Sequence, residues 1–298
     1  MRGFSGFKAA FVGSAALLFS AASLYAQPVP PVPPQPTNGL TVIPRFFNDF
    51  PNSTQTYSIN GGPTITNPPA NVGIPVAGAV NSVTVNDTNM VNSPASGFVN
   101  RDDLMLSTDA GATPFVGSIN TPFFQTATIN LTDLTDTQRK EAGIRVKAPV
   151  TGDAVFEINT TGEIVAFGGG APFFNFRPNI EAAYIPGQTI TLSEQYTPGV
   201  GGTTNGNPGT MQYWAQLSGG PLLTSGPLAW SNLEGGPGPN SFNIGAFVQA
   251  PDGSGASPSD FVNAAFTNIS GAVPEPASLG TIGFGALMLL GRRRQRVA

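Results

Sequence analysis

Acidic side chains are the residues of this chain whose type and spacing could support catalysis. Asp153 and Glu157 are four residues apart, so on one β-strand they would lie on the same face. Glu163, Glu181 and Glu194 are further candidates by residue type. Two carboxylates that face each other across a sugar, one with a raised pKa, hydrolyse glycosides. The plainer interpretation, which we expect to hold, is that these are solvent-facing strand residues that keep the protein soluble.

Composition limits the other chemistry. The 298-residue chain contains no Cys and no His, so it lacks Ser-His-Asp or Cys-His catalysis, a typical zinc site and the usual ligands of haem or thiolate clusters. Oxygen ligands cluster at residues 86–89 (Asn-Asp-Thr-Asn) and 101–103 (Arg-Asp-Asp), but neither run has the spacing of a calcium loop. We therefore expect no cofactor, with structural calcium as an alternative.

Aromatic side chains could also bind sugars by stacking. Dense groups occur at Phe123-Phe124, at residues 173–176 (Phe-Phe-Asn-Phe) and at Tyr213-Trp214. Core packing explains most aromatic residues of a β-sandwich, so we expect these groups in the core.

The elements that would position these residues are short β-prone runs separated by Gly, Pro, Asn and Asp. In residues 188–193, Ile190 and Leu192 alternate with Thr, as in a strand with one buried face. Many such runs predict an all-β, β-sandwich-like body with long Gly-, Pro- and Asn-rich loops. The predicted strands are 40–43, 54–59, 80–86, 125–131, 144–149, 154–159, 163–167, 188–193, 211–217, 242–249 and 261–267.

Local signals refine this fold. Residues 153–167 are expected to form a hairpin that turns at residues 159–162 (Asn-Thr-Thr-Gly). Residues 133–142 are expected to form one short helix, capped by Thr132 or Thr135 and stopped by Gly143. Residues 109–111 (Asp-Ala-Gly) and 252–253 (Asp-Gly) are typical of turns.

The N-terminus predicts export. Arg2 and Lys8 precede an apolar run at residues 9–22, and small residues lead to Ala26. This is the layout of a secretory signal helix, cut by signal peptidase between Ala26 and Gln27. Cleavage after Ala22 is a second choice, and an uncleaved anchor is disfavoured by the short apolar run. Residues 27–38 form a Pro-rich linker that favours polyproline II.

The C-terminus carries three signals in order: Pro274-Glu275-Pro276, an apolar run at residues 277–290, and a basic group made of Arg292, Arg293, Arg294 and Arg296. The apolar run, as a transmembrane helix, would be only about 21 Å long against a hydrocarbon core of about 30 Å. Its glycines weaken it further. The arginine group predicts a cytoplasmic end and a body on the outside. A permanent tail anchor is the alternative.

This arrangement resembles the C-terminal sorting signal of bacterial PEP-CTERM proteins. The resemblance covers residues 273–298 and implies nothing about the fold of the body. It implies that a membrane protease of the exosortase class recognises Pro274-Glu275-Pro276, removes the tail and passes the body to the cell envelope. The chain would then comprise a signal peptide (1–26), a linker (27–38), an extracellular β-rich body (39–272) and a sorting tail (273–298).

The predicted mature body is acidic. Between residues 27 and 273 lie seven Lys and Arg against sixteen Asp and Glu, a net charge of about −9. This balance argues against nucleic-acid binding and against adsorption to anionic lipid. Because the chain has no Cys, its stability outside the cell must come from a core and not from disulfides.

These patterns predict an exported bacterial protein of the cell surface or of an extracellular, biofilm-type matrix, with a non-catalytic structural or adhesive role. The alternatives are a secreted carboxylate-dependent enzyme that acts on polysaccharide, or a carbohydrate-binding module. A facing pair of buried carboxylates in a cleft would favour the enzyme, and an aromatic platform on one sheet face would favour the binding module.

Overall fold

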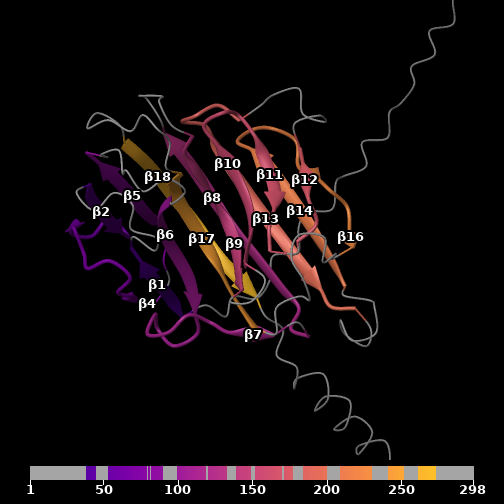
Figure 1. The fold of residues 1–298 in the computed structure, drawn as a ribbon, viewed down its shortest axis with the longest axis horizontal. Helices are drawn as coiled ribbons and strands as arrows, with labels where there is room; N and C mark the ends of the chain where they lie inside the picture. The colour runs from indigo at the N-terminus through magenta and orange to yellow at the C-terminus, as the bar shows by residue number, and fades with distance from the viewer. Residues whose placement is uncertain are drawn as a thin grey trace, which may run out of the picture.

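The body is a sandwich of two antiparallel nine-stranded sheets, seen one over the other in Figure 1. We describe it from a computed structural model. The residues that the structure describes are 38–44, 53–78, 80, 82–89, 99–118, 120–132, 139–148, 152–169, 171–176, 184–199, 209–229, 241–251 and 261–272. The signal peptide, most of the linker and the sorting tail predicted above lie outside them.

Sheet A has the strand order β12-β11-β10-β9-β17-β6-β1-β4, and β7 pairs with β17 beside this path. Its strands are β1 (Gly39–Ile43), β4 (Ile74–Ala77), β6 (Val99–Ser107), β7 (Gly117–Ser118), β9 (Glu141–Ala148), β10 (Gly152–Asn159), β11 (Ile164–Phe167), β12 (Phe174–Asn175) and β17 (Ser241–Pro251).

Sheet B has the order β15-β14-β13-β8-β18-β5-β2-β3, with β16 paired to β14. Its strands are β2 (Thr54–Ile59), β3 (Ile65–Thr66), β5 (Ser82–Thr88), β8 (Phe123–Thr132), β13 (Thr189–Thr197), β14 (Thr210–Leu217), β15 (Leu223–Thr224), β16 (Leu228–Ala229) and β18 (Phe261–Ala272). The chain crosses repeatedly between the sheets, and its last two strands, β17 and β18, lie in the middle of sheets A and B.

The core lies between the two sheets and follows the period-2 alternation of the strands. In β9, Ala142, Ile144 and Val146 are buried in the main hydrophobic cluster. In β8 of the opposite sheet, Ala127 and Ile129 belong to the same cluster. The all-β sandwich predicted from the sequence is therefore confirmed.

Each of the eleven predicted strands corresponds to an observed strand, with boundary shifts, and residues 153–167 form the predicted hairpin of β10 and β11. Strand β6 and the short strands β3, β4, β7, β12, β15 and β16 were not predicted.

The predicted helix is wrong in the part of it that the structure describes. Glu141 and Ala142 begin β9, and Gly143, the expected helix stop, lies within that strand. Pairing with both β10 and β17 and burial of alternate side chains outweigh the weak local helix signal. Residues 133–138 lie outside the described residues, as does the predicted turn at residues 252–253. The turn at Asp109 is confirmed, since Thr113 N donates to Asp109 Oδ1 at 2.9 Å.

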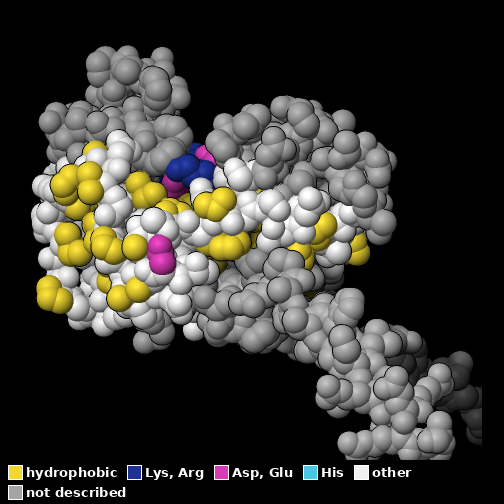
Figure 2. All heavy atoms as spheres, turned by 90° about the horizontal axis from the view of Figure 1, so that it is seen from below, with side chains coloured by type: hydrophobic (Ala, Val, Ile, Leu, Met, Phe, Trp, Pro, Cys, Tyr) yellow, Lys and Arg dark blue, Asp and Glu magenta, His cyan; other side chains and the backbone are white. Residues whose placement is uncertain are grey.

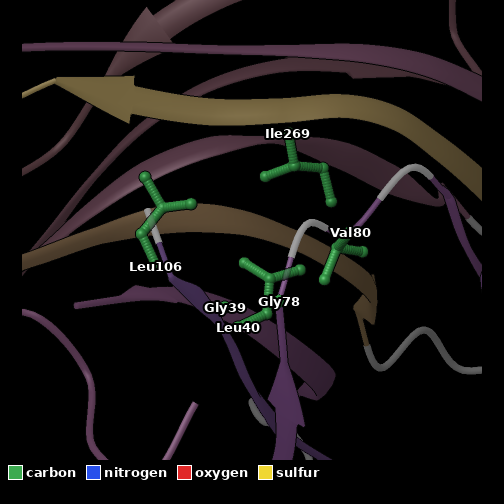
Figure 3. A pocket seen from close by; sticks show the side chains of 6 residues that line it. All are labelled: Gly39, Leu40, Gly78, Val80, Leu106 and Ile269. Atoms are coloured by element: carbon green, nitrogen blue, oxygen red, sulfur yellow. The ribbon is translucent and has the colours of Figure 1, made fainter. Parts of the chain in front are cut away.

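A small cavity opens between the sheets near one end of the body. Figure 3 shows Leu40, Val80, Leu106 and Ile269 around it, and Gly39 and Gly78 complete its lining. Its volume of about 10 Å³ offers room for roughly one water molecule. The cavity is therefore too small for a sugar.

Candidate functional site

The outer face of sheet A, turned away from the core, carries most of the charge of the described body. Because alternate residues of a strand point to opposite faces, the odd-numbered positions of β6, β9, β10 and β17 lie there. We define the charged face as the polar residues at these positions together with two residues just outside the strands, Arg139 and Glu163, that bind to them: Arg101, Asp103, Arg139, Glu141, Arg145, Lys147, Asp153, Glu157, Glu163 and Gln249. Of the five Lys and Arg among the described residues, four belong to it, although the body as a whole is acidic.

Arg145 is the centre of the charged face. Its side chain is fully buried, and its guanidinium pairs with Asp103 on β6 and with Asp153 on β10. Asp153 also binds Arg101, with NH1 and Oδ2 2.7 Å apart. Lys147 Nζ lies 3.4 Å from Asp103 Oδ2. Burial lowers the pKa of both Arg101 and Lys147, and the facing carboxylates partly offset this.

The Arg101–Asp153 contact requires a curved sheet. β6 and β10 are three strands apart, roughly 14 Å on a flat sheet. Arg101 Nε also donates to Gln249 Oε1 at 2.6 Å, and its guanidinium carbon lies 5.6 Å from the centre of the Phe247 ring. The long side chain of Arg101 thus bridges a concave face whose floor includes an aromatic ring.

Two glycines keep the centre of this face free of side chains. Gly245 on β17 lies opposite Arg145 on one side and Met105 on the other. A Cβ at Gly245 would lie 2.2 Å from Leu104 O, and one at Gly143 would lie 2.3 Å from Phe156 O. The strands therefore approach too closely for any other residue, and Arg145 can reach across β17 to Asp103.

A second group on the charged face joins two acids to one arginine. Arg139 Nε lies 2.6 Å from Glu141 Oε1, and its NH2 lies 2.9 Å from Glu157 Oε1. Burial, and then the neighbouring carboxylate and hydrogen bond of Glu141, raise the pKa of Glu157 well above its usual value. Glu157 Oε2 is buried, and no donor bonds to it. Gln249 Nε2 donates to Glu141 as well, and Glu163 Oε2 lies 3.8 Å from Arg139 NH2.

Further polar residues lie between the two sheets, not on the charged face. Asn100 Nδ2 donates to Asp87, and Tyr57 Oη donates to Asp102. At the other end of the core, Gln125 Nε2 donates to the carboxylate of Glu194. Burial raises the pKa of Glu194 to about 7. These groups bond to one another within the core and are buried.

The structure corrects the expectation that the strand carboxylates face solvent. Asp153 and Glu157 do share one face of β10, as predicted, but the side chain of Glu157 is 0% exposed and that of Asp153 only 21%. Glu163 is 28% exposed, and Glu194 lies in the core. Glu181 lies outside the described residues.

The two candidate calcium runs do not gather their oxygens. Asp102 points between the sheets while Asp103 points to the charged face, because the run at 101–103 is part of β6. Asp87 also points into the core, in β5. Among the described residues, no three acidic side chains converge as a metal site would require.

Aromatic residues mostly pack as expected. Phe123, Phe176 and Tyr213 belong to the core cluster. Trp214 and Phe124 are buried too, with ring centres 6.3 Å apart. Phe173 is exposed by 64%, but among the described residues it stands alone, so they present no exposed aromatic platform.

Sequence reasoning missed Arg101, Asp103, Glu141, Arg145 and Gln249 as members of one site. Strand β6 was not recognised because Asn-Arg-Asp-Asp is typical of a turn. A signal was nevertheless present in β9, where Glu141, Arg145 and Lys147 alternate with apolar residues.

Figure 2 shows one group of Lys or Arg side chains with Asp or Glu side chains beside it, on a face where the described residues carry little other charge.

The body is similar to several solved structures, but only at a low level. An alginate lyase from Klebsiella pneumoniae is 11% identical with a TM-score of 0.45, over 80% of this chain and 99% of that one. A PL-14 alginate lyase from Aplysia kurodai is 9% identical with a TM-score of 0.44, over 80% and 99%. Peanut lectin is 9% identical with a TM-score of 0.39, over 78% and 97%. The chain matches none of the curated proteins with which it was compared.

The C-terminal residues give a specific match. Residues 272–295 match the PEP-CTERM protein-sorting motif, and they include Pro274-Glu275-Pro276 and the first arginines of the basic group. No helix within the described residues is long and apolar enough to cross a membrane, and the tail lies outside them. The motif marks an exported protein that is held at the membrane by its C-terminus and processed by an exosortase, a membrane protease. The chain therefore carries a PEP-CTERM protein-sorting motif at residues 272–295.

Proposed function

We propose that this protein is delivered to the cell surface or the extracellular matrix after its tail is cleaved, and that its body has a non-catalytic structural or adhesive role there. The observation that carries the proposal is the sorting motif at residues 272–295. It begins at the last residue of β18, so removal of the chain beyond that strand leaves all the described strands intact. This supports a body that persists as a folded unit once it is released.

The geometry of the acid pair supports a non-catalytic role. Retaining glycosidases hold their two carboxyl groups about 5 Å apart and inverting ones roughly 6.5–9.5 Å apart. Glu141 and Glu157 instead share a hydrogen bond and bind the same guanidinium. A sugar ring therefore has no room between them.

The test is the intact mass of the protein recovered from membrane, surface and matrix fractions of its host. We expect a form that lacks residues 1–26 and everything beyond about Pro276, found in the surface or matrix fraction. A form that keeps Arg292–Ala298 and stays with the membrane would contradict the proposal and make the protein a tail-anchored one.

A second candidate is a secreted enzyme that acts on polysaccharide, and one observation favours it. Glu157 is a buried carboxyl with a strongly raised pKa on an outer sheet face, as a general acid would need. If this candidate is right, the processed protein depolymerises a polysaccharide, and Glu157→Gln abolishes the release of new reducing ends without a change in the melting temperature. Equal release by the variant would remove Glu157 from any such role.

A further inference from the structure

The charged face has a balanced charge. Its cations are Arg101, Arg139, Arg145 and Lys147, and its carboxylates are Asp103, Glu141, Asp153, Glu157 and Glu163. Burial raises the pKa of Glu157, so four cations face four carboxylates and one further carboxyl whose charged form is disfavoured. A polyanion or a polycation gains no net attraction from such a surface.

The polar groups of this face are held in fixed positions. Arg145 is bound on two sides by Asp103 and Asp153, and Arg139 by Glu141 and Glu157. A ligand that binds there does not need to order these side chains, so the entropic cost of binding is low. A set of donors and acceptors held in this way acts as a preorganised surface.

Part of this set is accessible. The exposed fractions of the side chains are 39% for Arg139, 28% for Glu163, 22% for Lys147 and 21% for Asp153. The accessible part thus contains two cations, Arg139 and Lys147, and two carboxylates, Glu163 and Asp153.

Burial of so many charges needs an explanation beyond stability. A buried ion pair usually contributes little net stability, since desolvation offsets the Coulomb attraction. Buried apolar residues at these positions would stabilise the fold equally well, as Met105 and Phe247 do on the same face. A binding role explains why polar groups occupy this face.

We propose that the charged face binds a neutral, hydroxyl-rich glycan. Adjacent sugar hydroxyls both donate and accept hydrogen bonds, so they match guanidinium, ammonium and carboxylate groups. An acidic glycan gains no net attraction, because the exposed groups are two cations and two carboxylates. The inference deepens the adhesive role proposed above and rests on it.

The experiment is affinity electrophoresis of the processed protein recovered from its host, in native gels that contain laminarin, xylan, galactomannan or, as the acidic probe, polygalacturonate. We expect at least one neutral polysaccharide to retard the protein, equally at 50 and 500 mM NaCl. Lys147→Ala and Glu163→Ala should each weaken this retardation at least fivefold. Gln216→Ala, an exposed polar position on sheet B, is the matched control and should bind like the wild type.

The outcomes separate this proposal from the proposed function. Absence of retardation by every neutral polysaccharide, or unchanged binding by both charged-face variants, overturns the glycan site. Retardation by polygalacturonate alone, lost at 500 mM NaCl, also overturns it, since it indicates simple electrostatic attraction. Thermal unfolding of each variant checks that it is folded. A correctly processed surface protein that fails these tests keeps its proposed surface role and loses only the site.

Discussion

Glu194 illustrates how burial controls the charge of individual residues in this protein. It lies between the sheets beside Gln125 and Tyr213, and its pKa rises from 4.5 to about 7. The folded state therefore binds this proton more tightly than the unfolded state does. The resulting stability is fully present below about pH 4.5 and is lost as the pH rises to about 7.

We expect Glu194→Gln to abolish the loss of stability that the wild type shows as the pH rises, because the amide resembles the protonated carboxyl in shape and charge. At pH 8 the variant should be more stable than the wild type by on the order of 2–3 kcal/mol, and at pH 4.5 the two should be nearly equal. Urea unfolding from pH 4.5 to 8 measures this. Glu163→Gln, at a more exposed carboxylate, is the control. Parallel pH profiles of Glu194→Gln and the wild type would show that Glu194 does not titrate in this range.

The pair of Glu141 and Glu157 gives a second test at this scale. If Glu157 is protonated, Glu157→Gln can still donate to Glu141, so its stability at pH 7 should lie within about 1 kcal/mol of the wild type. Arg139→Ala removes the shared cation and should cost about 1–3 kcal/mol, less than a fully buried pair because Arg139 is partly exposed. Urea unfolding compares the two variants. A loss in Glu157→Gln as large as that in Arg139→Ala would indicate an ionised Glu157.

Strands β9 and β17 bring the charged face together. Along β9, apolar residues point into the core while Glu141, Arg145 and Lys147 point outward. β17 lies between β9 and β6 and carries Gly245, Phe247 and Gln249 on the same side. Because β17 has a glycine, Gly245, opposite Arg145, both Arg145 from β9 and Arg101 from β6 can bind Asp153.

Gly245→Ala should therefore disrupt this element. The new Cβ would lie 2.2 Å from Leu104 O, a backbone atom that cannot move aside by a rotamer change. We expect a loss of about 3 kcal/mol or more in the free energy of unfolding. Gly220→Ala is the matched control, since its Cβ would lie 3.2 Å from Leu217 O, and it should cost less than about 1 kcal/mol. Equal melting temperatures for the two variants would refute the close approach of β17 and β6.

At the scale of the whole molecule, the last strand, β18, lies in the middle of sheet B, and the sorting motif begins where that strand ends. β18 pairs with β8 and β5, so the fold is complete only when residue 272 has been incorporated. The sorting motif starts at that residue. Cleavage of the tail can thus leave the folded body intact, because all the described strands lie before the cleavage site.

Glu275→Ala tests this arrangement in the host. If exosortase-type recognition needs Pro274-Glu275-Pro276, the variant should accumulate at full length in the membrane fraction, with little or no protein released. Intact mass and fractionation measure this. Ser278→Ala, three residues along the same tail, is the control and should be processed normally. Normal release of Glu275→Ala would exclude recognition through this motif.

The sequence by itself determined the sorting signal and the fold class of this protein. The sorting signal is local and linear, so adjacent residues such as Pro274, Glu275 and Pro276 carry it completely. The alternation of apolar and polar residues was likewise enough to predict the sandwich and most of its strands, since that period is a local property.

Only the tertiary structure decided which charges meet and which are buried. Arg101 and Gln249 are 148 residues apart in sequence, and Arg145 and Asp103 are 42 apart. Their contacts depend on strand order and sheet curvature, which no local pattern encodes. The burial of Glu157 depends in the same way on neighbours from other parts of the chain. Carboxylates that look like ordinary solvent-facing strand residues therefore became members of one paired, concave surface.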